Sequence, residues 1–242
     1  MGGVLAGALS LVLPVVTSAG AVPVALVCAA AGALLVRGRR AAERRHREHA
    51  AWAEPRSWVC TREDSGLVDR WRGRPFGEGS ARRATEVLRG TLDGFGATSF
   101  TYCWTTGTGE SAQVHRRHVV AIDLPAALPV LELTPEGVSA RIARAFGGQD
   151  LTFESEAFNR AWRVQATDLR FAHDVVHPRV MERLLLPDVS CTSLRIEGAS
   201  LLCWDEGTSD LVRLERRLAL LVGLVRAIPR HVWQDRGHLD PV

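Results

Sequence analysis

Two histidines four residues apart are the residues of this chain whose spacing points most directly to chemistry. They open and close the segment HDVVH at residues 173–177, which differs by one acidic residue from H-E-x-x-H, the helical zinc signature of metalloproteases. Positions i and i+4 share one face of a helix, so His173 and His177 could bind the same metal ion. With Glu197 as the candidate third ligand, this spacing favours a metal-dependent hydrolase.

The residue that follows His177 argues against that shared face. Pro178 disfavours the helical conformation at His177 and suits the first position of a new helix, PRVMERLLL, which Pro187 ends. Asp174 is also one methylene shorter than the glutamate base of the signature. We therefore expect a break between two short helices at His177, with His177 as a helix-cap residue, and we prefer structural roles for both histidines.

Other chemical signatures are weaker. The pairs Gly94-x-Gly96 and Gly107-x-Gly109 lack the third glycine and the lysine that phosphate-binding loops need, and no G-x-S-x-G elbow is present. The five cysteines include no C-x-x-C pair, which favours free thiols. We therefore assign no catalytic residue and no cofactor, and we expect a domain that is not an enzyme.

The first 36 residues have the composition of a membrane anchor. From Gly2 to Val36 no side chain is charged, and the absence of a basic residue before the apolar run distinguishes it from a secretory signal. As one helix, residues 4–36 would extend about 50 Å, against a hydrocarbon core of roughly 30 Å. We therefore expect either one transmembrane span with an apolar lead-in or a short hairpin that turns between Pro14 and Pro23.

A cluster of arginines follows the apolar run directly. Residues 37–47 carry a local charge of +5, whereas the whole chain carries +3, so the remainder is mildly acidic at −2. By the positive-inside rule the cluster places the rest of the chain in the cytoplasm, and it suits anionic lipid head groups at the plasma membrane. An acidic domain lacks the basic surface that nucleic acid requires. The six arginines are Arg37, Arg39, Arg40, Arg44, Arg45 and Arg47.

Alternating and helical patterns predict an α+β domain, a mainly antiparallel sheet packed with two or three helices, after the N-terminal transmembrane segment or segments. Phe100, Tyr102 and Trp104 occupy alternate positions of one predicted strand and so share one of its faces. Residues 119–124 are expected to pair with this strand on one side, and residues 87–93 on the other side, after a turn at residues 94–96. We also expect a short strand at 129–133, a helix that Thr134 caps, two strands broken at Gly198 within 194–204, and a final helix that Ser209 caps and Pro229 ends.

Several segments together resemble a group of membrane-anchored actinobacterial proteins of unknown function. After the apolar N-terminus these are LVDRWRGRPFGEGSARRATEVLRG, YCWTTGTG, LTPEG, GGQDLTFESEAFNRAWRV and FAHDVVHPRVMERLL, which cover most of residues 67–205. The resemblance implies the same architecture and a structural role for HDVVH, and it supplies no catalytic residue. The double-length apolar N-terminus departs from the single anchor that such a group implies.

The sequence thus predicts three parts: a transmembrane anchor at 1–36, a basic juxtamembrane helix or linker at 37–56, and a cytoplasmic α+β domain at 57–242. The anchor would insert in the bilayer, and the domain would bind a protein partner or anionic head groups as a non-enzymatic binding or regulatory module. The alternatives are the metal-dependent hydrolase and a membrane-associated scaffold or assembly protein.

Overall fold

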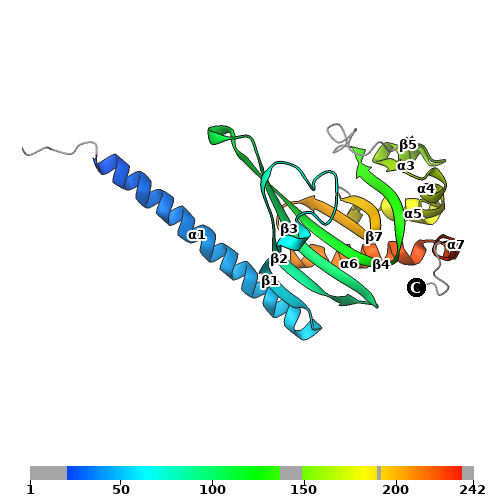
Figure 1. Cartoon of the computed structure of the whole chain (residues 1–242), viewed down its shortest axis with the longest axis horizontal. Helices are drawn as coiled ribbons and strands as arrows, with labels where there is room; N and C mark the ends of the chain where they lie inside the picture. The colour runs from blue at the N-terminus through cyan, green and yellow to red at the C-terminus, as the bar shows by residue number, and fades with distance from the viewer. Residues whose placement is uncertain (1–20, 137–148, 190–191, 236–242) are drawn as a thin grey trace, which may run out of the picture. The chain divides into compact units, whose positions relative to one another are not determined.

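A seven-stranded antiparallel sheet is the framework on which the other elements pack (Figure 1). The computed structural model describes residues 21–136, 149–189 and 192–235, and the chain divides into two units, residues 1–44 and 45–242. The strands are β1 (Val59–Glu63), β2 (Ser80–Leu92), β3 (Phe95–Thr106), β4 (Gln113–Pro135), β5 (Gln149–Leu151), β6 (Trp162–Ala166) and β7 (Ser193–Glu206). The helices are α1 (Ala21–Ala53), α3 (Glu156–Ala161), α4 (Leu169–Val175), α5 (Pro178–Leu184), α6 (Leu211–Ala227) and α7 (Arg230–Gln234), with 3-10 turns at Glu54–Arg56, Ser65–Leu67, Gly109–Ser111 and Pro187–Val189.

The central strands form consecutive hairpins, which confirms the predicted antiparallel α+β fold. Strands follow the order β1-β2-β3-β4-β6-β5, and β7 also pairs with β4. The β2–β3 turn consists of Asp93 and Gly94, with φ of 53° and 88°. Asp-Gly is a preferred pair for a two-residue turn with positive φ at both positions, because such a turn matches the twist of the strands.

Strand β4 is longer than expected and includes the short strand predicted at 129–133. Thr134 and Pro135, predicted to open a helix, are its last residues; Glu136 is helical, and the rest of the predicted helix lies outside the described residues. Strand β7 is likewise one strand, although Gly198 was expected to divide it. Gly198 has φ of 56° and pairs with Leu128, where the β4–β7 register shifts, so its conformational freedom lets both strands bend together.

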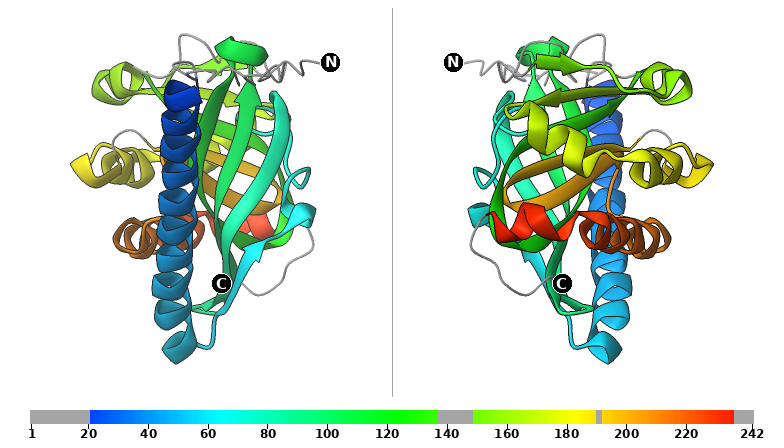
Figure 2. Two further views of the ribbon diagram at one scale, coloured as in Figure 1. Left: turned by 90° about the vertical axis from the view of Figure 1, so that its left-hand side faces the viewer. Right: turned by 90° about the vertical axis from the view of Figure 1, so that its right-hand side faces the viewer.

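Separate apolar clusters cover the two faces of the sheet. The helices α5 and α6 lie on one side of it (Figure 2), where they contribute to the larger cluster. On the other face the connection between β1 and β2 packs Trp71 and Phe76 against Phe100, Tyr102 and other residues of the smaller cluster. The alternation predicted for β3 therefore does place Phe100, Tyr102 and Trp104 on one face.

A fully buried arginine fixes that connection. Arg195 on β7 binds Glu132 on β4, with Arg195 Nη2 2.7 Å from Glu132 Oε2; the side chains are 0% and 3% exposed. The same guanidinium donates to the backbone carbonyls of Arg72 and Arg74, and it lies 5.0 Å from the ring centroid of Trp204. One side chain thus joins two strands and the loop that covers them.

Helix α1 contains the last part of the predicted anchor and the arginine cluster, and it ends at Ala53, two residues before Pro55 of the first 3-10 turn. The first twenty residues of the predicted anchor lie outside the described residues. Within the part of the chain that the structure describes, we find no helix with the length and apolar character needed to cross a membrane.

Candidate functional site

The HDVVH segment is divided between two helices, as Pro178, the residue that follows it, predicts. Helix α4 ends at Val175, and α5 begins at Pro178. His177 is the N-cap of α5 and has an extended backbone, with φ of −78° and ψ of 168°. His173 and His177 therefore lack the single helical face on which the zinc signature depends.

Each of these histidines has a neighbour within the domain. The ring of His173 lies 5.0 Å from that of Phe153, and His177 Nε2 is 3.0 Å from the carbonyl oxygen of Ala227, to which it donates. Both line a cavity of about 470 Å³. Glu197 does not line this cavity; it accepts from the backbone N–H of Arg72 at 3.0 Å. Among residues 21–136, 149–189 and 192–235, no group of three or more His, Cys, Asp or Glu side chains could hold a metal ion.

The arginine cluster has two kinds of member. Arg37, Arg39, Arg40, Arg44 and Arg47 are exposed on α1. The sixth, Arg45, donates from Nε to Oε1 of Glu86, a buried carboxylate on β2. In the structure, Arg45 thus anchors the end of α1, whereas the sequence grouped it with head-group contacts.

A set of hydrogen bonds continues from this ion pair and fixes the last turns of α1. Thr101 Oγ1 donates to Glu86 at 2.8 Å and accepts from the backbone N–H of Ser209 at 2.8 Å. His49 Nδ1 is 2.7 Å from the carbonyl oxygen of Arg45, and its Nε2 is 2.9 Å from Ser209 Oγ. Because a carbonyl only accepts, Nδ1 of His49 carries the proton and Nε2 accepts from the serine.

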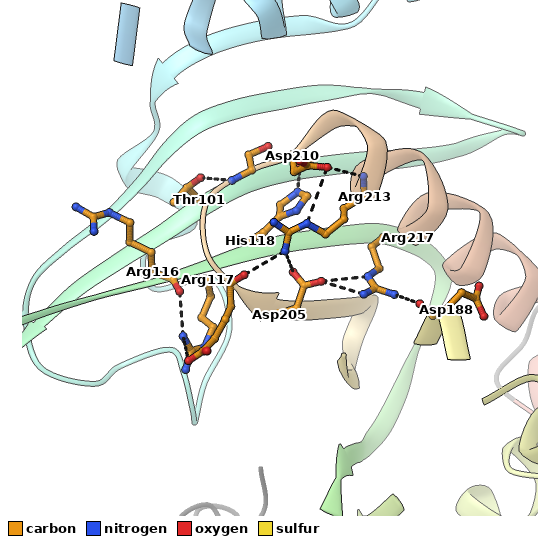
Figure 3. A network of polar contacts seen from close by, with 12 residues as sticks. Thr101, Arg116, Arg117, His118, Asp188, Asp205, Asp210, Arg213 and Arg217 are labelled. Carbon is orange, nitrogen blue, oxygen red and sulfur yellow. Dashed lines mark hydrogen bonds and ion pairs between the residues drawn. The ribbon is translucent and has the colours of Figure 1, made fainter. Parts of the chain in front are cut away.

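These contacts correct the predicted cap of the last helix. Ser209 binds His49 and Thr101, and the N-cap of α6 is Asp210, whose side chain accepts from Arg213 N at 2.8 Å. Both residue types are favoured caps, so tertiary contacts decide between them. Figure 3 shows Arg217 of α6 further along, donating to Asp205 on β7 at 2.9 Å and to the carbonyl of Asp188 at 2.8 Å.

A histidine whose pKa lies far from its ordinary value is found inside this polar region. His118 on β4 is 1% exposed, and its Nε2 is 2.9 Å from Ser99 Oγ. Burial lowers the pKa of His118 from its ordinary 6.5 to about 4, although the nearby Asp205 opposes the shift. Burial likewise raises the pKa of the Cys203 thiol, so both groups stay uncharged at neutral pH. A serine and histidine enclosed in this way cannot reach a substrate, and we assign them a structural role.

An apolar groove opens where the fixed end of α1 approaches α6. Its first wall is aromatic: Trp52 of α1 and the buried Trp58 meet edge to face, with ring centroids 5.3 Å apart. Trp58 packs directly on the backbone of β2, because a Cβ at Gly90 would lie 2.3 Å from its ring atoms. The tryptophans are thus held on two sides, by the contacts of α1 and by a glycine in the sheet.

The second wall of the groove is one face of α6. Leu218 and Val222 are buried at its base, and Ala219 and Gly223 are exposed one turn apart. A glycine in a helix interior costs about 1 kcal/mol relative to alanine. No atom lies within 4 Å of the place where a Gly223 Cβ would stand, so packing within the described residues does not require a glycine there. The groove has a volume of about 660 Å³, within the range typical of small-molecule sites.

Ion pairs join α6 to the neighbouring elements at two points of the groove. Arg56 binds Glu215 at 3.1 Å and lies 4.4 Å from the ring centroid of Trp52, whose Nε1 donates to the same carboxylate at 3.0 Å. Arg226 binds Asp93 of the β2–β3 turn at 3.0 Å. Glu215 and Arg226 are eleven residues apart on α6, which corresponds to about 16 Å along the helix.

Sequence patterns could not identify this groove, because its residues come from the end of α1, the β2–β3 turn and α6. Each local pattern has an ordinary interpretation: a basic helix, a hairpin turn and an amphipathic helix. The one local signal is Gly223, an isolated glycine within a helical pattern, which is unfavourable and can indicate a packing or functional reason.

The comparisons show likeness to one solved structure. No protein-family model and no curated protein sequence matches the chain. The crystal structure of the mycobacterial trehalose monomycolate transport factor A, TtfA, is similar, with a TM-score of 0.59 and 18% sequence identity, over 76% of this chain and 96% of that chain. Its mycobacterial origin agrees with the actinobacterial resemblance of the sequence. At this identity the likeness concerns the fold: this chain has the α+β fold of that transport factor.

Proposed function

We propose that the chain is a non-enzymatic accessory protein of a transport system for an amphipathic lipid. The observation that carries the proposal is the shared fold, since the match spans 96% of a protein named as a trehalose monomycolate transport factor. Trehalose monomycolate is a fatty-acid ester of a sugar, so the proposed cargo has an apolar chain and a polar head group. The apolar groove beside α6 supports the proposal, because it offers this domain an apolar binding surface.

We also propose that residues 1–36 anchor the chain in the plasma membrane, that residues 37–56 connect the anchor to the domain, and that residues 57–242 face the cytoplasm. The uncharged N-terminus and the exposed arginines on α1 support this arrangement. In such a position the five exposed arginines of residues 37–47 contact anionic head groups, each contributing about 1 kcal/mol near the surface. A transporter of the same membrane is then the natural protein partner.

A non-enzymatic role is supported by the way the domain uses its polar groups. The buried Ser99–His118 pair is enclosed, and the buried carboxylates of Glu86 and Glu132 each bind an arginine. The metal-dependent hydrolase built on His173, His177 and Glu197 stays the alternative. The observation in its favour is that both imidazoles line one cavity.

Depletion of the chain in the organism that carries it tests the proposal. Newly made glycolipid is labelled with radioactive acetate, and its amount and its fraction at the cell surface are measured separately. We expect depletion to lower the surface fraction while the total and the chemical species stay the same. A changed set of lipid species with normal transport would instead favour a hydrolase, and unchanged lipids in both measurements would refute the transport role.

A further inference from the structure

We infer that the groove between the end of α1 and α6 binds one acyl chain of a lipid whose head group is uncharged. The inference rests on the proposed function and names the class of molecule bound at that site. The groove is formed by residues of the second unit alone, from the end of α1 and the turn after it, from the β2–β3 hairpin and from α6.

The lining selects an occupant that is apolar along its length. The tryptophan pair forms one wall, and Leu218 and Val222 form the base of the other, so an acyl chain contacts aromatic and aliphatic carbon along the groove. An extended peptide would bring backbone N–H and C=O groups into the same space. Because the charged side chains of the lining all belong to the two ion pairs, backbone groups of a peptide between these pairs would lose their hydrogen bonds with water and gain few in return.

The length of the groove suits an acyl chain. Glu215, Ala219, Gly223 and Arg226 follow one another at spacings of three or four residues, so they lie in a row along α6. Between the ion pairs that Glu215 and Arg226 make, this row covers three turns of helix, about 16 Å. The two smallest residues of the row, Ala219 and Gly223, lie between the ion pairs and leave the surface of the helix open there.

The charges of the groove favour a head group without charge. Arg56 is neutralised by Glu215, and Arg226 by Asp93, so each ion pair has no net charge. A free fatty acid would place its carboxylate beside one of these carboxylates without an unpaired cation in the lining to offset it. The hydroxyl groups of a sugar or glycerol head group can donate to the carboxylates and accept from the arginines without disturbing either pair.

Photocrosslinking of the full-length chain in membrane vesicles tests the inference. The probes are a monoacylglycerol with a photoreactive diazirine in its chain and the free fatty acid with the same chain, each with and without excess unlabelled monoacylglycerol. We expect the monoacylglycerol to label the tryptic peptides 48–56, 57–62 and 218–226, which contain most of the lining, and the excess to compete with it. The fatty acid should label these peptides less.

Gly223→Leu is the decisive variant, because its side chain occupies the groove at a place where the backbone accepts any residue. We expect labelling of the three peptides to fall about tenfold, the scale at which one misplaced apolar group affects a hydrophobic pocket. Val212→Leu is the matched control: Val212 is exposed on the same helix, lies outside the groove, and should label as the wild type does. Ala219→Leu provides a second groove-filling variant should Gly223→Leu fail to fold.

Equal labelling of the wild type and both filled variants would overturn the inference, as would label confined to residues 1–47. Crosslinks from 218–226 to a second copy or to another protein, unaffected by excess lipid, would assign the groove to a protein partner. Equal labelling by the fatty acid would refute the uncharged head group. The depletion experiment separates the two proposals: if Gly223→Leu restores transport to depleted cells, the groove inference fails while the transport role stands.

Discussion

Replacing Arg195 should lower the stability of the domain strongly, and the variant Arg195→Met measures how much this side chain stabilises the fold. The variant removes the guanidinium that binds Glu132 on β4 and the carbonyls of Arg72 and Arg74. Thr134 Oγ1, at 3.4 Å, still donates to the Glu132 carboxylate, which stays 3% exposed while the fold is intact. Arg195→Met thus creates a buried charge without a counter-ion.

The expected loss follows from that charge. Removing one partner of a buried ion pair costs about 3–5 kcal/mol, and for a domain of roughly 200 residues each kcal/mol lowers the melting temperature by about 2–4 °C. We therefore expect Arg195→Met to melt roughly 6–20 °C lower than the wild type. The measurement is thermal unfolding of the full-length chain in a mild detergent, followed by near-ultraviolet circular dichroism of its tryptophans.

A double variant separates the charge from the loop contacts. Arg195→Met with Glu132→Leu leaves no buried charge, and such apolar replacements of ion pairs are often close to neutral. The two lost carbonyl contacts should still cost about 1 kcal/mol each. We expect the double variant to be more stable than Arg195→Met, with faster trypsin cleavage after Arg70 and Arg72 than in the wild type. A double variant no more stable than the single one, or a single variant within 1 °C of the wild type, would refute this account of Arg195.

Three further predictions concern the sheet, the groove and the HDVVH segment. The pKa of His118 is about 4 in the fold and 6.5 in the unfolded chain, so between these pH values the unfolded chain binds more protons. The contribution of His118 to stability is therefore fully present above pH 6.5, and about 3 kcal/mol of it should be lost on acidification to pH 4. Denaturation midpoints against pH should show a flatter slope for His118→Gln; an unchanged slope would contradict the assignment. Gly90→Ala should displace Trp58 and cost about 1–3 kcal/mol by overpacking, seen as a red-shifted tryptophan emission and a lower melting temperature, unlike the exposed control Val212→Ala. Plasma mass spectrometry of the untagged full-length chain should find far less than one zinc per chain, because the His177 ring nitrogen binds a backbone carbonyl. Stoichiometric zinc that is lost in the double variant His173→Ala with His177→Ala would instead support the metal-dependent hydrolase.

The parts of the fold that local chemistry determines were predictable. Alternation at Phe100, Tyr102 and Trp104 identified β3, and the proline at 178 identified the break after α4. Both effects act within a few residues, through the two-residue period of a strand and the steric clash of a proline ring. The antiparallel hairpins followed from these strands and the short turns between them.

Features that depend on distant residues were not predictable. Arg45 looked like its neighbours in a basic run, and the carboxylate that distinguishes it, Glu86, lies forty-one residues further along the chain. Ser209 and Asp210 are equally good caps, and the choice rests on His49 and Thr101. The groove combines three separate segments, so its tryptophans and its glycine acquire a shared meaning only when the sheet has brought them together.

Strand β4 also determines the order in which this chain can fold. Its first half pairs with β3 on one edge and with β7 on the other, yet β7 begins only at Ser193, long after Pro135 ends β4. At about 5–20 residues per second, a ribosome needs roughly 4–14 s to reach the end of β7 after completing β4. During that interval the β2–β3–β4 hairpins can form, but one long edge of β4 stays open to pairing with other chains. Chains truncated before residue 193 should therefore aggregate, and refolding of the full chain should be slow and limited by the closure of this distant pairing.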